Sequence, residues 1–306
     1  MIKDARILIR APFNEQYTLT IQSELSGVDV FVTSTVQLRY DFQVLKVDDD
    51  GLQVRLVQLD NILLEANNPM VREVAQVSQV FGRMYNELHI LLDHSGKVIR
   101  VLNYEFILSK WKQTKAEMDR HIAGNEDLQN AIILNDNIFK DPEKIKLAVS
   151  ANEFLGIYFG QVYNKDLPGA ETIKGTNIFN TVSMDWRMTT ASSVPLPAPA
   201  GVGSLTVSTV GAPAYALHSG FNNTAYGQFS NKLELKDLQP KMSQQETRII
   251  AYASGKLQEA AVNKVEIADE KLLYTKLTYT LKSDGGIVSV AAEGLGNEKD
   301  SKFSFF

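Results

Sequence analysis

The chain has 306 residues, of which 44% are hydrophobic and 22% are charged, so it can bury a large core and is neither disordered nor collagen-like. Its 31 Lys and Arg residues against 36 Asp and Glu residues give a net charge of −5, and the basic residues are spread along the sequence, which argues against nucleic acid as a partner. The absence of cysteine excludes disulfides, thiol nucleophiles and cysteine-ligated metals.

The length predicts two parts. We expect an N-terminal part over residues 1–165, built of antiparallel strands plus helices, and a β-rich part over residues 166–306, although the two could form one continuous domain. The charged start, with Lys3, Asp4 and Arg6, contains no apolar core of a signal peptide, so the expected location is cytoplasmic, with export after removal of a signal left open. We expect no membrane-spanning helix, because no run of about 18 apolar residues occurs.

The first elements are long strands. Apolar and polar side chains alternate over residues 16–66, and the run 36–47 is followed by Asp48-Asp49-Asp50-Gly51 and a second alternating run. Two such runs around an Asp-Gly turn predict an antiparallel hairpin. Asn67-Asn68-Pro69 then supplies an N-cap and a proline for the first helical position, which predicts a helix over residues 69–86.

The middle of the chain is helical. A second predicted hairpin around residues 94–96 leads into residues 104–163, where apolar side chains recur at helical spacing. One helix is expected over residues 104–122, and another begins at Asp141-Pro142, where Asp caps and Pro starts the first turn. These helices need a surface to cover, so we predict an α+β fold with a helical layer on antiparallel sheets.

The C-terminal part returns to strands. Alternating segments at about ten-residue spacing predict a meander. The expected strands cover residues 246–254, 257–268, 271–282 and 286–293.

The most unusual segment is 188–231, which contains no Asp, Glu, Lys or Arg. Three interpretations stay open: a long connection whose strands are buried on both faces, an exposed surface for a protein partner, and a membrane-inserting hairpin of the kind used by pore-forming proteins. The aromatic end of the chain adds a choice between an edge strand that enters the core and a docking tail. The candidate partner-binding residues are Val194, Leu196, Leu205, Val207, Tyr215, Leu217, Phe221, Tyr226, Phe305 and Phe306.

No catalytic or metal-binding motif rises above background. His89 and Asp93 would share one strand face with His94 on the other, which is a poor metal cradle, and His121 and His218 stand apart in the sequence. GxSxG, HExxH and SxxK motifs are absent. We therefore expect no metal and no cofactor, and an enzyme would need His89, Asp93 and His218 to converge in a cleft.

Two resemblances follow from the strand and helix pattern. The hairpin over residues 91–103, running into a helix that carries Trp111, is similar to uncharacterised β-rich proteins common in Bacteroidetes, over residues 36–115. That resemblance implies a bacterial protein and no particular activity. A curved sheet covered by helices also resembles lipoprotein carriers of the LolA type, which hold an acyl chain between sheet and helices.

These observations lead to two main functional hypotheses. The first is a non-catalytic protein-binding module, such as an adaptor, immunity or assembly component, that uses the charge-free segment. The second is a carrier of a lipid or another hydrophobic ligand, with a cavity between the sheet and the helices at 104–122 and 142–163. Its expected lining is Trp111, Met118, Leu155 and Phe159.

Overall fold

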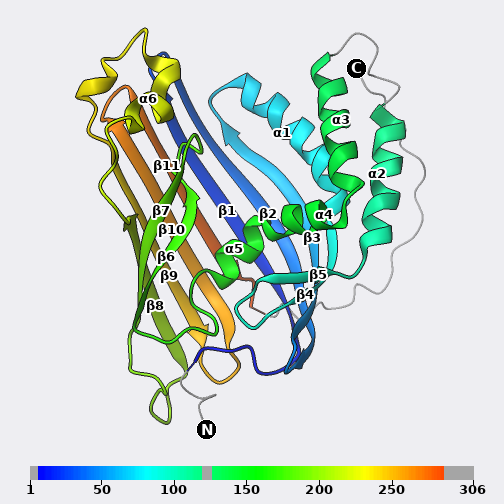
Figure 1. Cartoon of the computed structure of the whole chain (residues 1–306). Coiled ribbons are helices and arrows are strands. Elements are labelled where there is room, and N and C mark those ends of the chain that lie inside the picture. Colours follow the sequence, from blue (N-terminus) through cyan, green and yellow to red (C-terminus); the bar gives the residue numbers. More distant parts are fainter. Residues whose placement is uncertain (1–5, 119–125, 286–306) are drawn as a thin grey trace.

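One large sheet dominates the structure, a computed structural model that describes residues 6–118 and 126–285. Eleven antiparallel strands from these residues form it in the order β5-β4-β3-β2-β1-β11-β10-β9-β8-β7-β6 (Figure 1). Helices accompany the sheet, so the expected α+β class is confirmed. The strands are β1 (Phe13–Gly27), β2 (Val30–Asp48), β3 (Gly51–Ala66), β4 (Glu87–Leu92), β5 (Val98–Val101), β6 (Gly169–Thr176), β7 (Ser183–Ser192), β8 (Ser204–Pro213), β9 (Lys241–Ala251), β10 (Lys256–Asp269) and β11 (Leu273–Ser283).

The described α-helices are α1 (Pro69–Gly82), α2 (Tyr104–Met118), α3 (Glu126–Phe139), α4 (Pro142–Ser150), α5 (Glu153–Phe159) and α6 (Phe221–Tyr226). Short 3₁₀ helices cover Arg83–Tyr85, Gly227–Phe229 and Leu235–Asp237.

The two halves of the chain meet in the middle of the sheet. Strands β1 to β5 form one side, β6 to β11 form the other, and β1 pairs with β11 from Tyr17 beside Ser283 to Gly27 beside Leu273. Strands from both sides of the expected boundary at residue 165 therefore belong to one continuous sheet. The division into two domains stays a prediction.

The turn between β2 and β3 and the order of the last three strands match the sequence patterns. Strands β2 and β3 pair across the Asp-Gly turn, where Asp48 Oδ1 accepts hydrogen bonds from the backbone nitrogens of Asp50 and Gly51 at 3.1 and 3.2 Å. Near the C-terminal end, β9, β10 and β11 pair in sequence order. The strand expected at 286–293 lies outside the described residues.

Side-chain caps set the helix starts. Asn68 accepts a hydrogen bond from the backbone nitrogen of Met70 at 2.9 Å, and Pro69 opens α1, so the predicted helix at 69–86 is confirmed apart from its last, 3₁₀ turn. Asp141 caps α4 in the same way. The expected single helix after residue 141 is wrong, because Asn152 caps a separate helix, α5.

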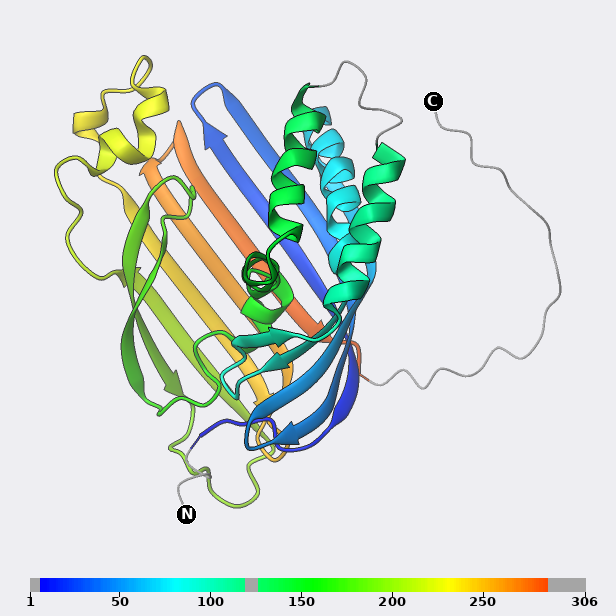
Figure 2. The same cartoon turned by 45° about the vertical axis from the view of Figure 1, so that its right-hand side comes forward.

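Helix α5 lies against the concave face of the curved sheet, whereas α1 to α4 gather beside β3, β4 and β5 (Figures 1 and 2). Phe154 and Tyr158 of α5 pack on Tyr17 and Phe42, with ring centroids between 4.8 and 5.7 Å apart. The Tyr158 hydroxyl also accepts a hydrogen bond from the backbone nitrogen of Leu257 at 3.2 Å. These contacts fill the lower half of the concave face with core.

A buried arginine holds the end of α5. Arg248 is 1% exposed, donates from Nε to the carbonyl of Ile157 at 3.1 Å and pairs with Glu246 at 2.6 Å. Gly160 follows α5 with φ of +52°, and a Cβ there would lie 2.2 Å from the Arg248 guanidinium. Only glycine fits this approach, which anchors α5 across the sheet.

Candidate functional site: an apolar hollow on the concave face

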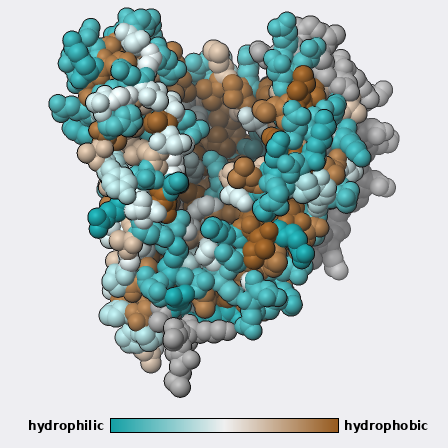
Figure 3. All heavy atoms as spheres, in the orientation of Figure 1, coloured by the Kyte–Doolittle hydropathy of each residue, from teal (hydrophilic) through white to brown (hydrophobic). Residues whose placement is uncertain are grey.

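The upper half of the concave face carries no helix across it, and Figure 3 shows a hollow there with hydrophobic residues at its base. Helix α6 lies on one side of the hollow, and α1 and α3 lie on the other (Figures 1 and 3). The register identifies the floor, because paired residues point to the same face of a sheet. Counting the row of Tyr17, which contacts α5, as the first, the third row on this face holds Val36, Ile21, Tyr279 and Val262. The fourth holds Ser34, Ser23, Leu277 and Lys264, and the fifth holds Val32, Leu25, Thr275 and Glu266.

Hydrophobic side chains on the floor and on α1, the helix that borders the hollow, remain open to solvent. Leu25 on the floor is 37% exposed. On α1, Met70, Val74 and Val77 are 69%, 63% and 52% exposed and share one helix face by their spacing. Gln79 points away from this stripe and donates to the Asn61 carbonyl on β3 at 2.9 Å. No residue within α1 is buried, and at its C-terminal end Phe81 packs against the core, with its ring centroid 6.4 Å from that of Trp111.

Two charged side chains enter the same space. Lys264 lies in the middle row of the floor, and its Nζ is 5.7 Å from the centroid of the Tyr279 ring. Glu153 stands in the first turn of α5 and is exposed, yet the surrounding walls remove enough water to raise the pKa of its carboxyl, an effect that Lys264 opposes. Burial, with a contribution from Glu153, raises the pKa of Tyr279 to about 12.

A buried carboxylate fixes the wall beside α6. Glu266 is 0% exposed and lies on β10. Its oxygens accept four hydrogen bonds, from Asn177 Nδ2 (2.9 Å), the backbone nitrogens of Ile178 (2.6 Å) and Phe179 (3.1 Å), and the Tyr226 hydroxyl (2.5 Å). The loop after β6 and helix α6 are therefore both held to the sheet by one side chain.

Four of the expected partner-binding residues in 188–231 are buried. Leu205 and Val207 face the concave side of β8 at 0% exposure, and Phe221 and Tyr226 of α6 are 3% and 0% exposed. They pack in the protein's own core, because β8 buries one face while its other face carries small hydroxylated residues. Of the remaining candidates, Val194, Leu196 and Leu217 are half-buried, Tyr215 is 70% exposed, and Phe305 and Phe306 lie outside the described residues.

The expected lining of a ligand cavity packs mainly in the core, although Leu155 and Phe159 also border a cavity of about 550 Å³ between α5 and the turn after β4. Trp111, Met118, Leu155 and Phe159 are all less than 8% exposed and belong to the main core cluster. Trp111, for example, stacks on Phe139 with ring centroids 5.1 Å apart. The hollow lies above α5, where sequence periodicity alone shows no difference from a packed core.

The three histidines that the structure describes do not assemble into a site. His89 lies on β4, near one edge of the sheet, whereas His218 follows β8 and packs against Phe221 at 6.1 Å between ring centroids. Asp93 accepts hydrogen bonds from Ser95 and Lys97 within its own turn. The structure therefore does not bring together the trio that an enzyme would have needed. His121 lies outside the described residues, which also hold no cluster of metal ligands.

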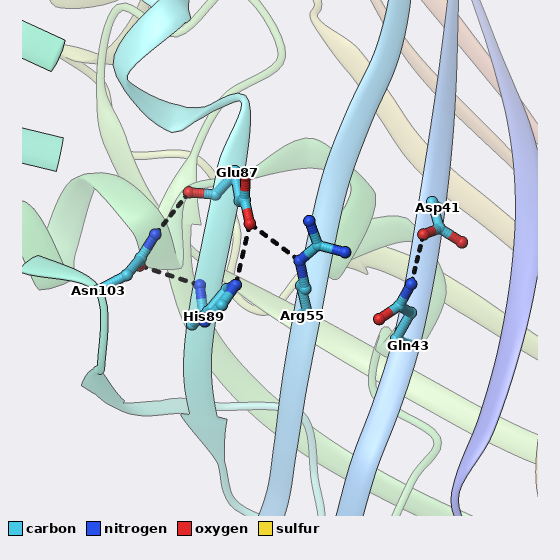
Figure 4. Close-up of polar contacts among 6 residues, drawn as sticks. All are labelled: Asp41, Gln43, Arg55, Glu87, His89 and Asn103. Atoms are coloured by element: carbon cyan, nitrogen blue, oxygen red, sulfur yellow. Dashed lines mark hydrogen bonds and ion pairs between the residues drawn. The ribbon is translucent and has the colours of Figure 1, made fainter. Parts of the chain in front are cut away.

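Figure 4 shows that His89 instead joins a polar cluster on the convex face. Glu87 accepts hydrogen bonds from Arg55 Nε at 2.9 Å and is 3.1 Å from His89 Nε2, and these contacts, led by Arg55, lower the pKa of Glu87. Asn103 ties the backbone of the same strand, accepting from the His89 nitrogen and donating to the Glu87 carbonyl at 2.9 and 2.8 Å. Each group is satisfied, so the cluster is structural.

One further cavity of about 550 Å³ lies at the other end of the sheet. His94 contributes to it, and His94 Nδ1 is the buried side-chain atom that lacks a hydrogen-bond partner among the described residues. Its lining mixes both signs of charge, including Arg6, Arg10, Asp48 and Asp49.

Comparisons with known proteins leave the chain without an assigned family. No family model matches it, and no curated protein matches it. A solved structure concerned with lipid–protein interactions in lipovitellin matches 90% of this chain at a TM-score of 0.43 and 8% sequence identity. The match spans 25% of that chain, and a TM-score this low does not establish a shared fold. Within the described residues, no helix has the length and apolar character needed to cross a membrane.

Proposed function

We propose that the protein is a carrier of a hydrophobic ligand, bound in the hollow above α5. The supporting observation is the apolar stripe Met70, Val74 and Val77, which stays more than half exposed on a helix that borders an open hollow with a hydrophobic base. An exposed apolar surface of this kind marks an interaction site, because burying it releases free energy. The ligand would occupy the space that the protein's own side chains leave unfilled.

The energetics suit an acyl chain. Each methylene that leaves water contributes about 0.8 kcal/mol, so ten buried methylenes supply about 8 kcal/mol. Association costs on the order of 4 kcal/mol or more. The surplus supports reversible binding, as a carrier requires.

A matched pair of variants tests the proposal. Val77 on α1 is 52% exposed, and Val210 on the convex face of β8 is 54% exposed. We expect Val77→Asp to weaken binding of the uncharged fluorescent probe N-phenyl-1-naphthylamine by about tenfold or more, because a carboxylate in an apolar site must be desolvated. Val210→Asp should leave the probe's affinity unchanged. An equal response of the two variants, or no probe binding by the unmodified protein, would refute the carrier function.

Native mass spectrometry after mild extraction supplies an independent measurement. A carrier purified without detergent should retain an apolar molecule of lipid mass. The Val77→Asp variant should retain less of it than the Val210→Asp variant.

A further inference from the structure

Two side chains of opposite charge face the hollow from different elements. Lys264 projects from β10, on the same row as Ser23 and Leu277, and Glu153 projects from the first turn of α5. They interact electrostatically, since Lys264 opposes the rise in the pKa of Glu153 that burial causes. Among the described residues, neither forms an ion pair within 4.0 Å.

The other charges on this face already have partners. Glu246 pairs with Arg248 at 2.6 Å, and Glu266 accepts its four hydrogen bonds from the wall beside α6. Within the described part of the chain, Glu153 on α5 and Lys264 on the floor are thus the two charges facing the hollow that are left to meet a bound molecule. A charge held in partly dry surroundings gains most from a partner of opposite sign.

We propose that the hollow selects an amphiphile whose headgroup carries both an ammonium and an anionic group, with the ammonium at Glu153 and the anion at Lys264. This rests on the proposed carrier function. A purely anionic headgroup would pair with Lys264 but meet repulsion from Glu153, and a simple amine would meet repulsion from Lys264. A zwitterionic headgroup satisfies both charges while its hydrocarbon lies along the apolar stripe of α1.

Three lipids with the same fluorescent label on the same acyl chain provide the test: phosphatidylethanolamine, phosphatidylglycerol and diacylglycerol. We expect the protein to bind phosphatidylethanolamine about tenfold more tightly than either of the others, because a hydrogen bond to a charged group outside bulk water contributes at least that factor. Glu153→Gln should lower the affinity for phosphatidylethanolamine to that for phosphatidylglycerol. Adding Lys264→Met to the Glu153→Gln variant should remove the remaining preference of both phospholipids over diacylglycerol.

The convex face offers matched controls. Glu24 and Lys276 form an ion pair at 3.0 Å on the opposite side of the same central strands, so Glu24→Gln and Lys276→Met should change none of the three affinities. Equal binding of all three lipids by the unmodified protein would overturn the headgroup inference and leave the carrier function standing. If none of the lipids binds, diacylglycerol included, both proposals fail. A preference that survives in the variant with both Glu153→Gln and Lys264→Met also overturns the inference.

Discussion

Replacing Glu266 with leucine should detach one wall of the hollow from the sheet. The fully buried carboxylate is the acceptor for four donors. Three lie on the loop after β6, namely the Asn177 side chain and the backbone nitrogens of Ile178 and Phe179, and the fourth is the Tyr226 hydroxyl of α6. Leucine fills a similar volume but accepts none of these hydrogen bonds. Each donor that stays buried then keeps its desolvation cost without compensation.

The expected loss can be estimated from these contacts. A hydrogen bond to a charged acceptor contributes about 1.5 to 3 kcal/mol. The contacts from Asn177 and Tyr226 are buried, whereas the amides of Ile178 and Phe179 are half-buried and can regain water. Counting only the two buried contacts in full gives a loss of about 3 to 6 kcal/mol in the free energy of unfolding.

Urea unfolding followed by circular dichroism measures this loss. Glu259→Leu is the control, since Glu259 lies on the same strand, on the convex face, and pairs with Lys282 at 3.2 Å near the surface. That change should stay within about 0.5 kcal/mol. If Glu266→Leu costs less than about 1 kcal/mol, or no more than the control, the carboxylate does not hold this wall.

Three further predictions concern the anchor of α5, the convex cluster and the hollow floor. Gly160→Ala should lower the free energy of unfolding, measured by thermal unfolding, by about 3 kcal/mol, because the new Cβ would lie 2.2 Å from Arg248 and φ is positive. The control, Gly156→Ala, should not destabilise the protein, because its Cβ would meet nothing within 4 Å. Similar losses in the two variants would contradict this reasoning. Asn103→Ala should cost about 1 to 2 kcal/mol in urea, since two backbone contacts are lost, with probe binding in the hollow unchanged. Burial raises the pKa of Glu153 in the folded protein above its ordinary value of 4.5. The stability that this shift contributes is fully present below the pKa of the unfolded chain and is lost as the pH rises through the pKa of the folded protein. Glu153→Gln should therefore gain stability relative to the unmodified protein as pH rises above 4.5, and urea midpoints that keep a constant difference across that range would contradict it.

Local chemistry made part of the fold predictable. Asn68 and Pro69 mark the start of α1, and the Asp-Gly turn after β2 marks a hairpin, because capping and turn residues act on their immediate neighbours. The break between α4 and α5 was not predicted, since the apolar stripe runs through it. The sequence showed the N-cap of α4 at Asp141, and the signal that was missed is a second N-cap, Asn152, which starts α5.

The site was harder to predict, because an apolar side chain has the same sequence pattern whether its own chain or a ligand covers it. Val77 and Phe81 lie on one stripe of α1, yet Val77 is exposed and Phe81 packs near Trp111. The charge-free segment misled for a related reason: Leu205 and Val207 alternate with Ser and Thr, which is the pattern of a strand buried on one face. On the sheet itself, Lys264 interrupts an apolar alternation, and this was the available hint of a polar spot on the concave side.

The pairing of β1 with β11 has a consequence for biosynthesis. Tyr17 and Ser283 are neighbours in space, so β1, the first long strand to be synthesised, can pair one of its edges only after β11 has been synthesised. Until then an edge in the middle of the future sheet stays available to other chains, which is a condition that favours aggregation. The pairing of β1 with β11 joins residues that are far apart in sequence, so we expect this step of folding to be slow and late. We also expect chaperones to assist the chain during synthesis.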